Sequence, residues 1–136
     1  MRATAAANIF AKTFIALSAV VIGFQLAVAA GAPWGALTMG GAFPGRLPPR
    51  MRVAAVASAV LWLAFAAVVA ARAGLALPRW RGASRRLIWV IVAVTLVGVA
   101  LNAVTSSPWE RALWLPVALA LAACALVVAR STSGAE

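Results

Sequence analysis

The chain contains very few of the residues that bind metals or transfer protons. Its 136 residues include no histidine, one cysteine (Cys124) and only two acidic residues, Glu110 and Glu136. A single cysteine cannot form an internal disulfide. Zinc, copper and iron sites need several histidine, cysteine or carboxylate ligands, which this composition does not supply. We therefore expect no metal, no cofactor and no catalytic residue.

Charged residues of any kind are also scarce. They make up 10% of the chain, against roughly 25% in average soluble proteins, while hydrophobic residues make up 65%. Disordered chains are poor in apolar residues, so the composition excludes disorder. A soluble domain would need more polar residues to cover its surface. The composition is that of an integral membrane protein.

Four hydrophobic runs cover most of the chain: residues 9–30, 53–71, 87–105 and 108–130. Each has roughly the 20 residues that an α-helix needs to cross about 30 Å of hydrocarbon. The runs are apolar on all sides, as lipid-embedded helices are. We predict an all-α fold, a four-helix transmembrane bundle that forms one domain over residues 1–136, with a glycine- and proline-rich outer loop between the first two helices.

The first run has a second interpretation. Arg2 and Lys12 resemble the basic start of a signal peptide, and residues 27–29 read Ala-Val-Ala, as at a cleavage site. The apolar stretch is longer than that of a usual signal peptide, and small residues recur at helical spacing, which suits helix packing. We expect a retained helix, with cleavage of residues 1–29 as the alternative.

The outer loop, residues 31–52, combines glycines and prolines with large apolar side chains. It contains five glycines and four prolines, so a long helix is not expected there. A free linker would not need its apolar residues, which are Trp34, Leu37, Met39, Phe43 and Leu47. Irregular backbone at membrane depth must be covered by protein or face water. We expect a compact cap over the bundle, which either closes it or acts as a binding loop.

Polar residues are predicted to gather beneath this loop. Gln25 and Asn102 fall in the same third of the membrane, and an unpaired amide in hydrocarbon costs several kcal/mol, so both should point into the bundle. The candidate polar cluster is Gln25, Asn102, Thr105, Glu110, Arg50 and Arg52. Hydrogen bonding between helices is the simpler role for these residues. A ligand pocket is the alternative.

The fourth helix has a clear start in Ser107, Pro108 and Glu110. A serine cap, a proline in the first helical position and a glutamate three residues after the cap form a capping box. We therefore expect Glu110 to cap the helix, with a catalytic or ion-binding role, for which no partner acid exists, as the alternative. A proline further on, Pro116, should kink the same helix near the outer leaflet. Trp62, in the middle of the second run, is expected to pack against helices or lipid, with ligand stacking as the alternative.

The connection between the second and third runs, residues 72–86, is strongly basic. Five arginines and a tryptophan in this segment are typical of contact with anionic lipid head groups at the membrane surface. The lipid-contact residues are predicted to be Arg72, Arg79, Trp80, Arg81, Arg85 and Arg86. An acidic protein partner is the alternative. Because the basic residues flank hydrophobic runs, we expect no nucleic acid partner despite the net charge of +10.

Parts of the chain resemble small four-span bacterial integral membrane proteins of uncharacterised type. The resemblance is carried by residues 33–45 of the outer loop, by Leu101-Asn102, and by residues 109–116, which include Trp109-Glu110-Arg111 and Trp114-Leu115-Pro116. It implies a four-span membrane fold and brings no activity and no site with it. The chain differs from small multidrug transporters, because the interior of its first run carries no carboxylate.

Three functions fit these features to different degrees. The inventory of side chains best suits a non-enzymatic structural, accessory or partner-binding membrane subunit, which could form homo-oligomers or join other membrane subunits. A small oligomeric transporter or channel for a neutral or anionic solute is the alternative, and the missing intramembrane acids disfavour a proton-coupled pump. A lipid enzyme would depend on Glu110, Arg50 and Arg111 alone.

The distribution of arginine and lysine predicts the orientation. The side that carries both termini holds eight basic residues: Arg2, Lys12, Arg72, Arg79, Arg81, Arg85, Arg86 and Arg130. The other side holds four: Arg46, Arg50, Arg52 and Arg111. The positive-inside rule therefore places both termini in the cytoplasm of a multi-pass protein of the cytoplasmic (inner) membrane. A reporter fused after Glu136 should be active in the cytoplasm, and activity in the periplasm would overturn this topology.

Overall fold

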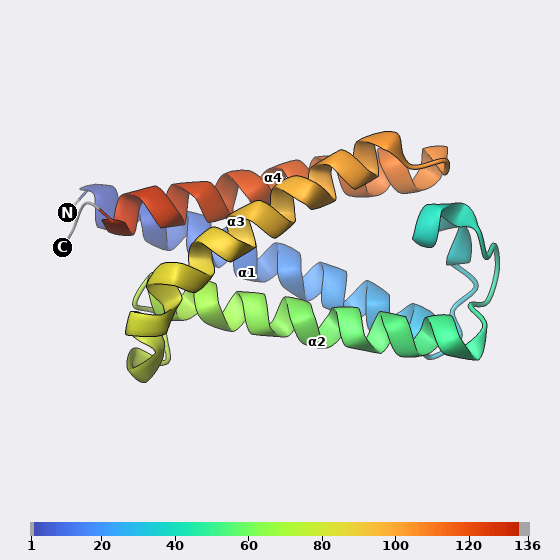
Figure 1. Ribbon diagram of the computed structural model, residues 1–136, viewed down its shortest axis with the longest axis horizontal. Helices are drawn as coiled ribbons and strands as arrows, with labels where there is room; N and C mark the ends of the chain where they lie inside the picture. The colour runs from blue at the N-terminus through green and yellow to red at the C-terminus, as the bar shows by residue number, and fades with distance from the viewer. Residues whose placement is uncertain (1, 134–136) are drawn as a thin grey trace.

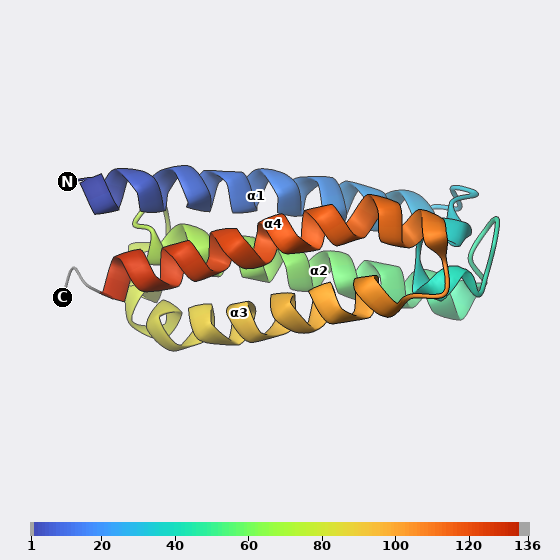
Figure 2. The same ribbon diagram turned by 90° about the horizontal axis from the view of Figure 1, so that it is seen from above.

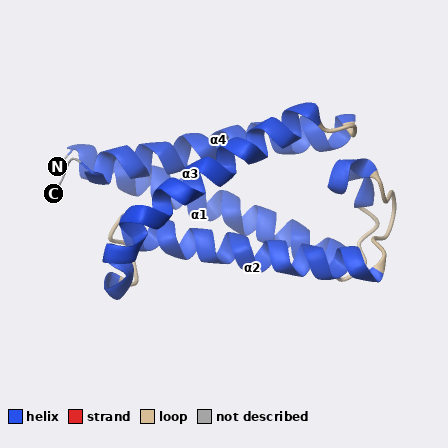
Figure 3. Cartoon of the chain, viewed as in Figure 1, coloured by secondary structure: helices blue, strands red, loops and turns tan. Residues whose placement is uncertain are grey.

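The computed structural model describes residues 2–133, which form four long helices joined by turns and three single-turn 3-10 helices (Figures 1 and 3). The long helices are α1 (Arg2–Ala29), α2 (Pro49–Arg72), α3 (Arg81–Val104) and α4 (Pro108–Ser133). All four are long and apolar enough to cross a membrane. The predicted all-helical bundle is thus confirmed, and each predicted run lies in one long helix or ends within a few residues of it.

The helices alternate in direction and surround a common axis (Figure 2). α1 packs against α2 and α4, and α3 packs mainly against α4. We call the end that carries the α1–α2 connection the loop end, and the end that carries the α2–α3 connection the basic end. α3 starts beside α2 at the basic end and runs toward α4 at the loop end (Figure 1). In consequence, α2 and α3 pack less extensively than the other neighbouring pairs.

The closely packed core lies toward the basic end. Its fully buried members include Ala11 and Phe14 of α1, Val69 of α2 and Val128 of α4. Because α1 supplies Phe14 to this core, it is an integral helix of the bundle. A second, smaller core lies near the loop end and is formed by Val28, Leu47 and Ala55. Between these two cores the bundle is less completely filled.

The connection between α1 and α2, residues 30–48, is the compact cap expected from the sequence, and we call it the long loop. It contains two 3-10 turns, η1 (Gly35–Leu37) and η2 (Met39–Gly41). The amide of Gly35 donates to the carbonyl of Gly45 over 2.8 Å, which closes the loop on itself. A Cβ atom at Gly35 would lie 1.8 Å from the carbonyl oxygen of Phe43. Only glycine therefore allows this close approach of two backbone segments.

α4 is a single helix that continues through Pro116. The proline ring has no N–H to donate to the carbonyl of Ala112, but the helix on either side is long enough to preserve the fold. At the basic end, α2 and α3 are joined by residues 73–80, which include the 3-10 turn η3 (Pro78–Trp80). The remaining connection, between α3 and α4, is a short turn at Thr105–Ser107. It brings the start of α4 directly beneath the long loop.

Candidate functional site

The first turn of α4 carries the predicted serine cap. The hydroxyl oxygen of Ser107 accepts a hydrogen bond from the amide of Glu110 over 3.2 Å, and the carbonyl of Ser107 accepts from the amide of Arg111 over 3.1 Å. Pro108 occupies the first helical position, where its missing N–H costs nothing. This half of the predicted capping box is confirmed.

The other half is wrong, because the Glu110 carboxylate binds elsewhere. In a capping box it would accept from the amide of Ser107, but that amide donates to the hydroxyl of Thr105 over 3.4 Å. Glu110 Oε2 instead accepts from the amide of Gly40 over 2.8 Å and from the Thr105 hydroxyl over 3.0 Å. The Gly40 amide has no acceptor within the turns of the long loop, and the Glu110 carboxylate serves as its acceptor.

Two side chains of α4 and the side chain of its cap residue Ser107 together bind the backbone of the long loop, and we call these three the α4 clamp. The Ser107 hydroxyl donates to the carbonyl of Ala36 over 2.6 Å. The Trp114 indole N–H donates to the carbonyl of Leu37 over 2.9 Å. Glu110 is the third member. Residues 107, 110 and 114 are three and four apart, so they share one face of the helix.

Aromatic packing strengthens the same contact. The ring of Phe24 in α1 meets Trp114 edge to face, with centroids 4.8 Å apart, and stacks on Trp34 of the long loop at 6.1 Å. Aromatic pairs in such arrangements add about 0.5–1.5 kcal/mol each beyond the area they bury. Trp114 therefore joins α1, α4 and the long loop.

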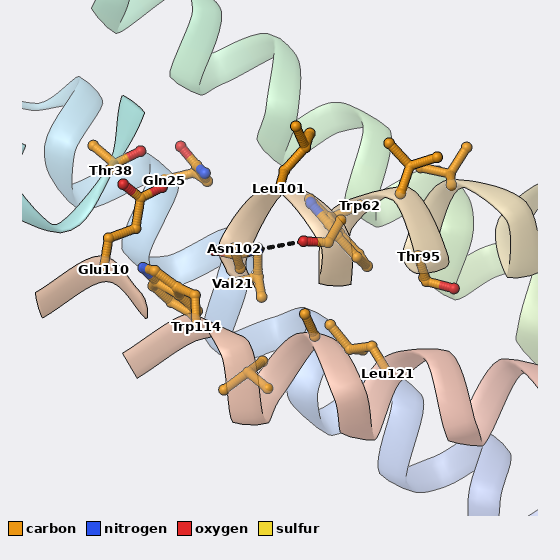
Figure 4. Close-up of a pocket in the computed structure, with 15 residues that line it drawn as sticks. Val21, Gln25, Thr38, Trp62, Thr95, Leu101, Asn102, Glu110, Trp114 and Leu121 are labelled. Carbon is orange, nitrogen blue, oxygen red and sulfur yellow. Dashed lines mark hydrogen bonds between the residues drawn. The ribbon is translucent and has the colours of Figure 1, made fainter. Parts of the chain in front are cut away.

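A cavity of about 300 Å³ lies beneath the long loop (Figure 4). It lies between the closely packed core toward the basic end and the smaller core near the loop end. All four long helices and Thr38 of the loop contribute to its wall. The lining residues that carry polar atoms or aromatic rings are Gln25, Thr38, Trp62, Thr95, Asn102, Glu110 and Trp114. Three of the predicted cluster residues, Gln25, Asn102 and Glu110, thus line one cavity.

The two amides do not join helices to each other. Asn102 Nδ2 donates to the carbonyl of Gly98 in its own helix over 2.8 Å. Gln25 Oε1 is buried and has no hydrogen-bond partner. Thr95 likewise donates to carbonyls of its own helix. The expected bonding between helices is therefore wrong for these atoms, and the cavity wall keeps an acceptor whose hydrogen-bonding capacity is unmet.

The cavity reaches the side of the bundle along α3. Two residues of its wall, Val97 and Leu101, are 58% and 63% exposed. They lie on the helix that runs away from α2 at the loop end (Figure 1). In a membrane these apolar side chains face hydrocarbon, so this side of the cavity wall borders lipid rather than water.

Arg50 and Arg52 are not part of this site, contrary to the sequence prediction. Neither lines the cavity. Arg52 Nε donates to the carbonyl of Leu47 over 2.9 Å, and its guanidinium lies against Gly31. Arg52 therefore fixes the start of α2 to the ends of the long loop, while Arg50 is exposed. Thr105 approaches the cavity only through its hydrogen bond to Glu110.

The basic end differs from expectation at one residue. Arg72 is only 9% exposed and counts among the buried residues, so it does not offer its charge to the surface as predicted. The other predicted lipid-contact residues, Arg79, Trp80, Arg81, Arg85 and Arg86, are all exposed. The burial of Arg72 follows from its place in the last turn of α2, where its side chain lies within the bundle.

Trp62 packs as the sequence suggested and also contributes to the cavity. Its ring lies 6.2 Å from that of Phe14 and 5.5 Å from that of Phe65. Thr38 and Trp114 also line the cavity, and the sequence did not predict either of them as a site residue. The spacing of Ser107, Glu110 and Trp114 on one face of α4 is the pattern that could have identified Trp114. Thr38 has no comparable pattern, because its position depends on how the loop folds.

No protein-family model, curated protein or solved structure matches this chain. Its fold and site define a class nonetheless: an all-helical bundle of four helices able to span a membrane, capped at one end by a loop that α4 holds over a cavity.

Replacing Trp114 with phenylalanine tests the α4 clamp. The substitution removes the N–H that binds the Leu37 carbonyl and keeps a ring beside Phe24. A typical hydrogen bond contributes about 1 kcal/mol, so amide exchange in the long loop should become about fivefold faster. Hydrogen–deuterium exchange in detergent measures this. Trp109→Phe is the matched control, since Trp109 is 71% exposed. Equal exchange in both variants would contradict the clamp.

Proposed function

We propose that this chain is a non-enzymatic protein of the cytoplasmic membrane that binds a small ligand within its bundle and acts as an accessory or partner-binding subunit. The single observation that carries the proposal is the cavity with the partnerless Gln25 Oε1 in its wall. A buried acceptor without a donor costs about 1–3 kcal/mol. A bound molecule that donates a hydrogen bond would recover this cost.

The side chains of the cavity support binding rather than catalysis. Glu110 is the only acidic residue in the wall, and its Oε2 already accepts two hydrogen bonds. The Thr95 hydroxyl donates to carbonyls of its own helix. Because the sequence has no histidine, no imidazole can act as the base for a hydroxyl nucleophile. Among residues 2–133, no three metal-binding side chains lie together.

Transport of a neutral or anionic solute is less well supported. A path through one chain would have to continue to the basic end, where Ala11, Phe14 and Val128 are fully buried. A second cavity of about 390 Å³ lies there between α2 and α3, but Ser84 is the only hydroxyl in its otherwise apolar and aromatic wall. The wall of the loop-end cavity has no basic side chain that would attract an anion.

In this proposal the loop end faces outward and both termini lie in the cytoplasm. The alternating helices place the start of α1 and the end of α4 at the basic end (Figure 1). The exposed arginines of residues 79–86 would then contact anionic lipid of the inner leaflet, each gaining about 1 kcal/mol near the surface. Trp80 would lie among the same head groups, where an indole is favoured.

Filling the cavity tests the binding role. On α3 the wall includes residues 94, 95, 98, 101 and 102, so Gly98 lies at the centre of the lining face. A Cβ atom at Gly98 meets nothing within 4 Å, and a helical glycine is costly by about 0.5–1 kcal/mol, so Gly98→Phe should fold. Native mass spectrometry of protein purified in mild detergent should show a bound small molecule on the wild type and none on Gly98→Phe.

Gly23→Phe is the control, because a Cβ atom at Gly23 also meets open space while the residue does not line the cavity. This variant should keep the bound mass. If Gly98→Phe carries the same mass as the wild type and the control, or if all three carry none, the cavity is not a binding site and the proposal is wrong.

A further inference from the structure

The charge of the loop-end cavity is unlike that of the rest of the chain. The chain has twelve basic and two acidic residues. The cavity wall has one charged residue, and it is an acid, Glu110. The neighbouring Arg111 directs its guanidinium to the carbonyl of Thr105 over 2.6 Å. The charge that complements this wall is therefore positive.

The polar groups lie at one end of the cavity. Figure 4 shows Thr38, Gln25 and Glu110 together beneath the long loop, with Trp114 beside them. Trp62, Thr95 and Leu121 lie at the other end, toward the middle of the bundle. Since the Thr95 hydroxyl is bound within its own helix, that end offers mainly apolar and aromatic surface. A matching ligand has one polar end and one apolar body.

The polar end holds a carboxylate and a buried acceptor without a partner. Gln25 Oε1 has no partner. Glu110 Oε2 accepts from two neutral groups, the Gly40 amide and the Thr105 hydroxyl, neither of which brings a positive charge. A carboxylate binds a charged donor more strongly than a neutral one. Indole rings such as those of Trp62 and Trp114 also attract cations.

Resting on the proposed function, we propose that this cavity binds an amphiphilic ammonium ion, a protonated amine attached to an apolar or aromatic body. The ammonium group lies between Gln25 Oε1 and the Glu110 carboxylate, and the body extends along Trp62 and Leu121. The ligand enters from the bilayer past Val97 and Leu101, the exposed wall residues of α3. This route suits a molecule that already partitions into lipid.

Three probes with the same body test the ligand class: 4-phenylbutylamine, 4-phenylbutanol and 5-phenylpentanoate. They differ only in a cationic, neutral or anionic end. Each is titrated against purified protein in zwitterionic nanodiscs, and the rise in the unfolding midpoint reports binding. The amine should bind about tenfold more tightly than the alcohol, and the carboxylate should not bind. The net charge of +10 attracts the carboxylate and repels the amine. Tighter binding of the amine would therefore have to come from groups in the cavity wall.

Four variants test which residues are responsible for ligand binding. Glu110→Gln keeps an acceptor for the Gly40 amide and removes the charge, so it should abolish the preference for the amine over the alcohol. Gln25→Leu leaves the α4 clamp intact and should weaken amine binding about fivefold, as the loss of one hydrogen bond predicts. Gly98→Phe should remove the binding of the amine and the alcohol, and Gly23→Phe should change neither.

The outcomes separate the two proposals. If the alcohol or the carboxylate binds as tightly as the amine and Gly98→Phe removes this binding, the cavity is a binding site and the ammonium inference is wrong. If the amine shows the same midpoint shift in the wild type and in Gly98→Phe, the inference fails together with the proposed function. If Glu110→Gln keeps the full amine preference, the carboxylate is not its source and the inference is overturned.

Discussion

The hydrogen bonds from one face of α4 to the backbone of the long loop determine the form of this protein's loop end. Glycine and proline prevent the loop from forming a regular helix, so its backbone N–H and C=O groups need partners from elsewhere. Ser107, Glu110 and Trp114 supply them at Ala36, Gly40 and Leu37. Without these partners, the middle of the long loop would lose its hydrogen bonds to the start of α4.

The same contact explains why a cavity exists. The loop is fixed to the start of α4 and, through Arg52 and the Leu47 carbonyl, to the start of α2. The long loop therefore spans the loop end as a cap. There, α3 runs toward α4 and packs less extensively against α2. The residues that could fill the space are small or turned outward, as Gly98 and Leu101 show. The tight core is confined to the basic end.

The helices and the inward direction of Gln25 and Asn102 could be predicted from sequence. A helix that crosses hydrocarbon needs about 20 mostly apolar residues, and its polar side chains must face the protein interior. The roles of Glu110, Arg52 and Arg72 could not. A capping box and a carboxylate bound to a distant loop amide have the same local sequence, and only the loop's fold decides between them. Arg52 and Arg72 both flank apolar runs, yet one binds a backbone carbonyl and the other is buried, because their neighbours in space differ.

A disulfide between the loop and α4 tests this account most directly. A Cβ atom at Gly41 lies 3.1 Å from Ser107 Cβ, a few tenths of an ångström short of the roughly 3.5–4.5 Å of a disulfide, whereas one at Gly45 meets nothing within 4 Å. Both glycines have a positive φ, so the strain of a cysteine is matched between the two positions. In a Cys124→Ser background, Gly41→Cys with Ser107→Cys should form a disulfide in native membranes, and Gly45→Cys with Ser107→Cys should not. If the first pair stays reduced to the same extent as the second, the loop does not lie on α4 and the account is wrong.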